Sequence, residues 1–153
     1  HLFLDGDVPY LYWGGWRHCV VARLADDLRS LAEPPREITP EYYVEGPFMV
    51  RRGHHYILMW SEGNWTDGTY RVAYGVADSP YGPFIRRDVI LSNDPDIAEG
   101  AGHHSVLKVP GEDRYLIAYH RRLFGDTNPH HRVTCIDSLT IHDDGSIEPV
   151  QMT

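Results

Sequence analysis

The chain has 153 residues, the length of one domain or of part of a larger one, and its hydrophobic content of 42% is enough for a packed core. A net charge of −8 without a basic stripe argues against nucleic acid and anionic membrane surfaces as partners. No run of about 18 apolar residues is present to span a membrane, and two cysteines do not make a disulfide scaffold.

A degenerate repeat predicts three similar units along the chain. Each unit has a Tyr-rich apolar run after a turn signal, which is typical of the second strand of a hairpin. The three runs are Tyr10-Leu11-Tyr12-Trp13, Tyr56-Ile57-Leu58-Met59-Trp60 and Tyr115-Leu116-Ile117-Ala118-Tyr119. Their spacing suits a propeller blade of four strands, which takes roughly 40–50 residues, or more with loop insertions.

Further strand-like runs complete each unit. Third strands are expected at 19–22, 70–74 and 132–136, and fourth strands near 36–38, 84–86 and 147–150. Residues 26–32 are expected to form a loop or one helical turn that ends at Pro34-Pro35. The sequence therefore predicts an all-β partial β-propeller whose three blades span about 1–40, 41–99 and 100–153.

Three blades do not close a propeller, because closed rings take about four to eight. An open arc exposes sheet edges and apolar sides, so the chain is expected to associate with missing blades or with itself. His1 opens directly into a strand-like run, which also suggests that the chain starts within a domain.

Glu45 is the strongest candidate for chemistry. It lies in Glu45-Gly46-Pro47-Phe48, where a Gly-Pro turn beside aromatic residues can fix and desolvate a carboxyl group. Glycosidic bond cleavage needs a carboxylic acid that stays protonated near neutral pH. A carboxyl group in this setting is suited to that role.

These segments together resemble glycoside hydrolase family 43, the five-bladed propeller arabinofuranosidases, xylosidases and arabinanases. The supporting segments run in order from Asp5-Gly6-Asp7 and Glu45-Gly46-Pro47-Phe48 through Ala77-Asp78-Ser79-Pro80 and Gly100-Ala101-Gly102-His103-His104 to Asp144-Gly145-Ser146-Ile147. The resemblance implies that the chain is the last three of five blades. It also implies an inverting mechanism, with Glu45 as the general acid.

By the same resemblance, two other catalytic carboxylates fall outside the chain. The aspartate that tunes the pKa of the acid would lie just before His1, and the general base about two blades earlier. Asp5 and Asp7 are read as turn formers rather than as replacements. The chain alone is therefore expected to show no turnover.

The resemblance also implies a metal ligand and sugar contacts. His103 matches a histidine at the propeller axis that often reaches a calcium ion through water; the alternative is a hydrogen-bonded loop histidine. Arg132 matches an arginine that binds hydroxyls of the terminal sugar, with Arg121 and Arg122 as weaker candidates, or it is an exposed arginine at a strand end. Trp65 either stacks on a sugar at the pocket mouth or packs within its loop.

Other histidines and tryptophans are assigned structural roles. The pairs His54-His55 and His130-His131 have no Cys or Glu partner at a zinc-like spacing, and the first pair is expected in a solvated hairpin turn. His104 is expected to pack locally. Trp13 and Trp60 lie in the repeated strands and are expected in the core.

The sequence thus predicts a glycoside hydrolase that removes terminal α-L-arabinofuranosyl or β-D-xylosyl units from plant-type polysaccharides. Two alternatives of other classes stay open. One is a carbohydrate-binding propeller segment without catalysis, and the other is a propeller segment for protein interaction.

Overall fold

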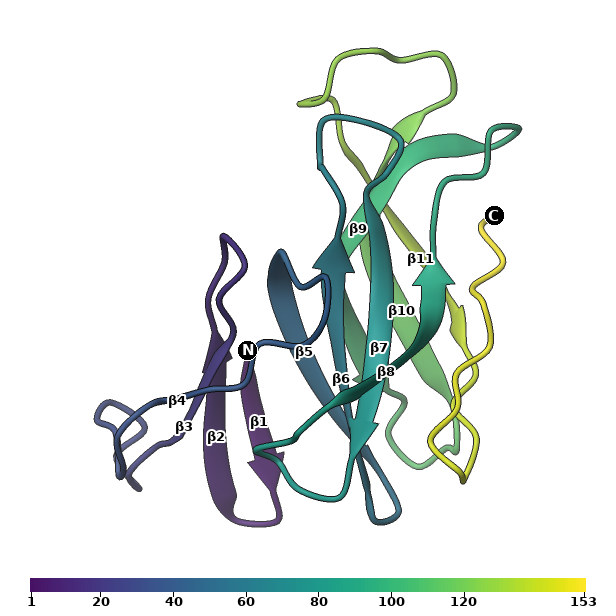
Figure 1. Ribbon diagram of the computed structural model, residues 1–153. Coiled ribbons are helices and arrows are strands. Elements are labelled where there is room, and N and C mark those ends of the chain that lie inside the picture. Colours follow the sequence, from purple (N-terminus) through teal and green to yellow (C-terminus); the bar gives the residue numbers. More distant parts are fainter.

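The computed structural model describes all 153 residues as three antiparallel sheets without a helix (Figure 1). The strands in chain order are β1 (Leu2–Asp5), β2 (Val8–Trp13), β3 (Val20–Arg23), β4 (Arg36–Glu37), β5 (Glu45–Arg52), β6 (His55–Glu62), β7 (Arg71–Ala77), β8 (Ile85–Leu91), β9 (Ala98–Lys108), β10 (Tyr115–Leu123) and β11 (Val133–Leu139). The predicted all-β fold is confirmed, and no helix is available that could cross a membrane.

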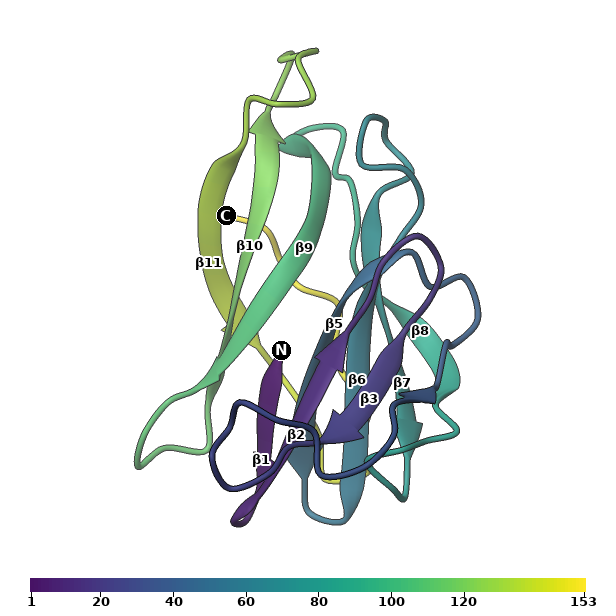
Figure 2. The same cartoon turned by 90° about the vertical axis from the view of Figure 1, so that its left-hand side faces the viewer.

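Each sheet is a meander whose strands follow one another in the order of the chain. The first sheet holds β1 to β4, the second β5 to β8 and the third β9 to β11. The first strands of successive sheets lie against one another, because β1 contacts β5 and β5 contacts β9 (Figure 2). This is the arrangement expected of the inner strands of neighbouring propeller blades.

The Tyr-rich repeat falls where the hairpin prediction placed it. Tyr10, Tyr56 and Tyr115 lie on β2, β6 and β10, the second strands of the three sheets. The predicted third strands correspond to β3, β7 and β11. Hairpin turns and alternating apolar residues were therefore sufficient to find the repeated unit.

The core consists of two apolar layers, one on each face of the second sheet. Along β6 the side chains alternate between them, as a strand requires. Leu58 and Trp60 pack toward the first sheet, while Ile57 and Met59 pack toward the third, and all four side chains are inaccessible to solvent. The prediction that Trp60 belongs to the core is confirmed.

The third sheet has three strands, so the fourth strand predicted near residues 147–150 is wrong. Ile147 forms only an isolated bridge to Ile141, and the backbone N–H of Val150 donates to the carbonyl of Ile90 on β8 at 2.7 Å. The backbone N–H of Glu148 donates to Thr140 just after β11, so the C-terminal segment bonds partly to its own turn and partly to the second sheet and adds no fourth strand. Residues 26–32 form a loop without a helical turn.

Candidate active site

A β-bulge at the start of β5 sets the position of Glu45. Glu45 pairs with Ser61 and Phe48 with Met59, so β5 carries one extra residue between these pairs. Gly46 lies in this bulge with φ of 66°, a conformation that residues with a Cβ rarely adopt. A Cβ there would lie 3.2 Å from the Ser61 Oγ. Bulges re-aim the side chains beside them, and here the affected side chain is the candidate acid.

The two oxygens of Glu45 have different surroundings. Oε1 accepts a 2.8 Å hydrogen bond from the hydroxyl of Tyr70 and lies 3.8 Å from Nδ1 of His103. Oε2 has no hydrogen-bond partner in the protein. The side chain is 33% exposed, so it is held on one side and accessible on the other. This asymmetry leaves one oxygen free to exchange a proton with a bound molecule.

Tyr70, which fixes Glu45, is almost completely buried. Its ring stacks against His120 with centroids 5.8 Å apart. Gly102 lies against the other part of the ring, where an added Cβ would come within 2.3 Å of a ring carbon. Burial raises the pKa of the Tyr70 hydroxyl above its ordinary value, so it remains a hydrogen-bond donor. A buried aromatic ring therefore anchors the candidate acid.

His103 reaches the same site from the third sheet. The β9–β10 register pairs His104 with Tyr119 and Gly102 with His120, which leaves His103 in a bulge with φ of 43°. Its backbone N–H donates to the Ser61 Oγ at 3.2 Å. Its side chain is half exposed. The second and third sheets are thus joined at the site through backbone as well as side chains.

His120 lies behind His103 and Tyr70, with its ring centroid 6.4 Å from that of His103. Burial, reinforced by the positive charges of Arg132 and His103, lowers the pKa of His120 to about 4. The imidazole is therefore neutral near pH 7. It packs against Tyr70 without adding a charge to the site.

Glu45 and His103 line one pocket of about 400 Å³ between the first strands of the three sheets. The lining residues are His1, Tyr12, Trp13, Gly14, Glu45, Gly46, Pro47, Phe48, His103 and His104. Glu45 is the only carboxylate among them. Aromatic rings and one carboxyl group form the kind of surface that binds the apolar face of a sugar and acts on its glycosidic oxygen.

Arg132 and Trp65 lie together outside this pocket. The guanidinium carbon of Arg132 is 5.1 Å from the centre of the Trp65 ring, a cation–π contact, and its Nε donates to the carbonyl of Pro129 at 3.3 Å. Burial is the main cause of both pKa shifts, but the positive charge of Arg132 opposes the rise in the pKa of Tyr70 and adds to the fall in the pKa of His120. Arg132 therefore lies close enough to the site to affect its electrostatics, although it does not line the pocket.

The weaker arginine candidates, Arg121 and Arg122, lie away from the Glu45 pocket. Arg122 is buried and contacts the Thr66 carbonyl and Glu99 at 3.4 Å each. Arg121 is partly buried, and two of its guanidinium nitrogens have no hydrogen-bond partner. Neither residue lines the Glu45 pocket.

Comparison with known proteins decides the family. The family model for glycosyl hydrolases of family 43 matches residues 1–147. The chain belongs to glycosyl hydrolase family 43. The resemblance found in its sequence motifs is therefore confirmed.

Two curated proteins are similar to the chain. The chain is 46% identical over 155 residues to the beta-D-galactofuranosidase xynD of Aspergillus niger, an alignment that covers 99% of this chain and 45% of that protein. It is 27% identical to a beta-xylosidase of Xylanibacter ruminicola, over 79% of this chain and 38% of that protein. The chain spans less than half the length of these curated relatives.

Solved structures show the same fold. A thermostable family-43 glycoside hydrolase superposes with a TM-score of 0.82 at 26% identity, covering 100% of this chain and 57% of that chain. An alpha-L-arabinofuranosidase from Clostridium thermocellum superposes with a TM-score of 0.79 at 25% identity, over 99% of this chain and 52% of that chain. The three sheets therefore have the arrangement found in family 43 propeller enzymes.

Three residues around Glu45 were not assigned to this candidate site from the sequence. Tyr70 and His120 lie in strand-like runs and have no motif around them, although the two glycines flanking Ala101 indicate a close approach of another chain segment. Trp13 was predicted to be a core residue, which is wrong. It is only partly buried and lines the pocket, because it ends β2 at the inner side of the first sheet.

The surroundings of His103 fit a calcium ion only if the ion keeps most of its water. Calcium takes six to eight oxygen ligands. Around His103 the chain offers one imidazole, the Tyr70 hydroxyl and the Glu45 carboxylate; the hydroxyl and Oε1 of Glu45 are already joined in a hydrogen bond, which leaves Oε2 as the one free oxygen. Nε2 of His103 has no partner in the protein, so it is available to one ion or to a water molecule of its shell.

Proposed function

We propose that Glu45 is the general acid of an inverting glycoside hydrolase, and that these 153 residues act within a longer protein. The observation that carries the proposal is the asymmetry of the Glu45 carboxyl group. Tyr70 holds Oε1 from a buried position, while Oε2 is free of protein partners at an aromatic pocket. A general acid must hold its proton on an oxygen that a substrate can reach.

In the proposed reaction, Oε2 of Glu45 gives its proton to the glycosidic oxygen as the bond to the anomeric carbon breaks. A water molecule attacks that carbon from the opposite face, and a base removes its proton. The products are an alcohol from the leaving group and a sugar of inverted anomeric configuration. Tyr70 keeps Oε1 in place as Glu45 becomes a carboxylate, because its hydroxyl donates to the ionised form.

The general base and the pKa-tuning aspartate are proposed to lie outside these residues. An inverting pair stands about 6.5–9.5 Å apart across the substrate. The pocket has no carboxylate besides Glu45, which supports a base from another part of the protein. The chain by itself is therefore expected to be inactive.

The substrate is proposed to be a terminal α-L-arabinofuranosyl or β-D-xylosyl unit of a plant-type polysaccharide. A second candidate is a terminal β-D-galactofuranosyl unit, favoured by the identity of 46% to the Aspergillus niger protein with that name. The two furanosyl units share a ring configuration, and galactofuranose has an additional exocyclic carbon. Arg132 and Trp65 are proposed to bind the sugar, since a guanidinium fork and an indole face suit hydroxyls and an apolar ring face.

His103 is proposed to bind a hydrated calcium ion at the propeller axis, with no reaction step assigned to the ion. If it does, calcium should raise the melting temperature of the protein, and His103→Ala should remove that increase. An equal calcium effect in the protein and in His103→Ala would rule out this ligand.

The flanking sheets are proposed to be covered by further blades or by a second copy of the chain. Leu2 and Leu4 on β1 are 45% and 59% exposed, and Ile136 on β11 is 62% exposed. Exposed apolar residues at open sheet edges favour association. Light scattering after size-exclusion chromatography should therefore show oligomers of the isolated chain, and a stable monomer would contradict this proposal.

The reaction is tested by following the first product with proton NMR. The full-length protein is incubated with nitrophenyl arabinofuranoside, xyloside and galactofuranoside, and the anomeric signal of the released sugar is recorded before mutarotation. Release of the inverted anomer from one of them supports the proposal. Retention would overturn the mechanism, and binding of polysaccharide without any release would favour the carbohydrate-binding alternative.

A further inference from the structure

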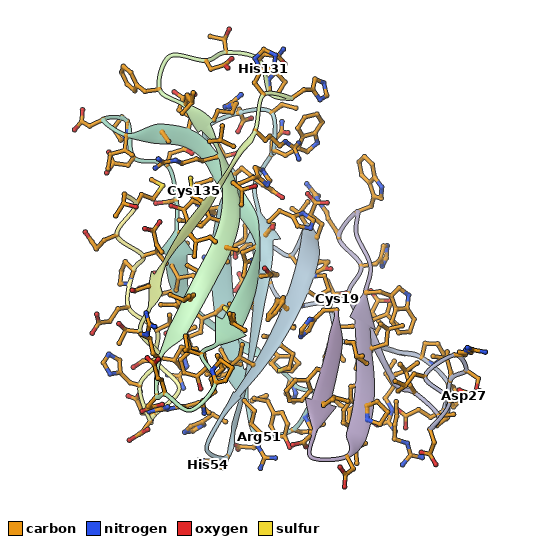
Figure 3. The ribbon with its side chains drawn as sticks, turned by 180° about the vertical axis from the view of Figure 1, so that it is seen from behind. Cys19, Asp27, Arg51, His54, His131 and Cys135 are labelled. Atoms are coloured by element: carbon orange, nitrogen blue, oxygen red, sulfur yellow. The ribbon has the colours of Figure 1, made fainter.

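A second group of ligand side chains lies at the opposite end of β5 from Glu45. The β5–β6 hairpin turns at Gly53, and His54 and His55 follow directly. Figure 3 labels His54 and Arg51 together at this end of the molecule, well away from the pocket-lining end of the strand. The group is therefore independent of the proposed catalytic site.

The register of the second sheet brings a carboxylate to the histidine pair. Tyr56 on β6 pairs with Ala77 on β7. Asp78 follows β7 directly, one residue beyond this last pair, which brings it next to His55 at the start of β6. One nitrogen of each histidine and one oxygen of Asp78 lie within 4.8 Å of one another. Sheet pairing thus provides a third ligand that no short sequence spacing indicates.

None of the three side chains is bonded to another group of the protein. His54, His55 and Asp78 make no side-chain hydrogen bond or ion pair in the protein, and Nδ1 of His55 is buried without a partner. The two imidazole rings lie with centroids 3.8 Å apart. The buried Nδ1 of His55 is the atom that most needs a partner, because buried polar atoms in proteins are usually hydrogen-bonded.

The neighbouring charges favour a cation at this point. Arg51 of the same hairpin is paired with Asp5, and Arg52 is paired with both Asp113 and Asp143. These carboxylates outnumber the two arginines, so the guanidinium groups neither bind Asp78 nor leave an uncompensated positive charge at the hairpin.

The position of His55 is fixed by the third unit. A Cβ on Gly145 would lie 3.3 Å from both Cβ and Cγ of His55, so the loop after Ile141 packs directly on this side chain. One ligand is therefore held in place by packing, which lowers the entropy that metal binding must overcome. The other two lie at the surface, where a metal can enter.

We propose that His54, His55 and Asp78 bind a divalent transition metal, with zinc the ion that suits them best. Two imidazole nitrogens and one carboxylate oxygen are ligands that zinc accepts, and a water molecule completes a four-coordinate shell. The ion would join the β5–β6 hairpin to the segment after β7. It would stabilise this end of the second sheet and take no part in glycoside hydrolysis.

The proposal is tested by titrating zinc chloride into the protein in a calorimeter. The protein should bind one ion that His54→Ala and Asp78→Asn each weaken by at least about 10-fold, since even partners of metal ligands contribute 10–100-fold. Zinc should also raise the melting temperature of the protein and not of the variants. Circular dichroism checks that the variants, which change exposed side chains, are folded.

Two control variants separate this site from other histidines. His18→Ala removes an exposed histidine of the first sheet that pairs with Glu37 at 2.9 Å, and His103→Ala removes the pocket histidine. Both should bind zinc as the unchanged protein does. If His54→Ala and Asp78→Asn bound zinc with unchanged affinity, or if His103→Ala alone abolished binding, the proposed site would be wrong.

Discussion

The second and third sheets contribute to the site in different ways. The second sheet is covered on both faces, and it supplies Glu45 and the buried Tyr70 that anchors it. Only one face of the third sheet is covered, and its residues Leu107 and Ile136 are exposed. The third sheet supplies the half-exposed His103. The difference indicates that the proposed general acid lies on the most buried part of the chain, while the proposed ion ligand comes from a more open one.

The largest expected effect belongs to the second sheet. Glu45→Gln in the full-length protein should lower the rate on polysaccharide by about 10²–10⁴-fold, because the amide cannot donate the proton that a general acid supplies. The matched change in the third unit is Glu112→Gln, in the turn between β9 and β10, which alters a side chain that is 53% exposed and outside the pocket. It should leave the rate within about two-fold, because surface substitutions away from special features have small effects. Equal losses of rate in both variants would show that the effect of Glu45→Gln is not specific to the pocket on the second sheet.

A pair of leucines tests whether the second sheet is more tightly packed than the third. Leu58→Ala on β6 removes a fully buried side chain and should lower the free energy of unfolding by about 2–5 kcal/mol. Leu107→Ala on β9 changes a side chain that is 57% exposed, and it should change this free energy by no more than about 0.5 kcal/mol. Urea denaturation measures both values. Similar losses would show that the third sheet is covered in solution, as association would predict.

Two buried tyrosines, one from each of the two sheets, test whether only the second sheet anchors the proposed acid. Tyr70→Phe removes the hydrogen bond to Glu45, which at a charged acceptor is worth about 1.5–3 kcal/mol, so kcat should fall by roughly 10–100-fold while the fold is kept. Tyr119→Phe removes a similar 2.7 Å bond to Asp137 on the third sheet. It should lower stability without lowering kcat. Loss of kcat in both variants would indicate a general effect of packing.

The smallest effect concerns the two free cysteines. Cys19 is fully buried between the first and second sheets, and burial raises the pKa of its thiol to about 12, so it should not react with a thiol reagent at pH 8. Cys135 on the third sheet is partly exposed and should react. Labelling followed by mass spectrometry should find one modified cysteine before unfolding and two after it. Modification of Cys19 in the folded protein would show that the contact between the first and second sheets opens in solution.

The sequence was informative where a local pattern determined the structure. The repeated Tyr runs and turns located the second strands, whereas the Glu-Gly-Pro-Phe segment, read as a turn, begins β5 and carries a bulge. The fourth strand near 147–150 was predicted from the same local rules. It failed because the C-terminal segment found its hydrogen-bond partner, Ile90, on another sheet.

Contacts between distant segments were not predictable in this way. Tyr70 and Glu45 are 25 residues apart, and their hydrogen bond depends on a bulge in β5 and on the close approach of Gly102. Asp78 meets His55 through sheet register rather than through sequence spacing. Such pairs depend on how strands far apart in the chain align and on where they bulge, and no short run of residues specifies the position of a bulge by its hydrophobic pattern.

The dependence of the Glu45→Gln effect on leaving group tests the central claim most directly. Rates of the full-length protein and of the variant are compared on a natural oligosaccharide and on a nitrophenyl glycoside of the same sugar. Nitrophenolate leaves with little need of a proton, so the loss predicted for the oligosaccharide should be at least about 10-fold larger than the loss for the nitrophenyl substrate. An equal loss on both substrates would contradict the assignment of Glu45 as the general acid.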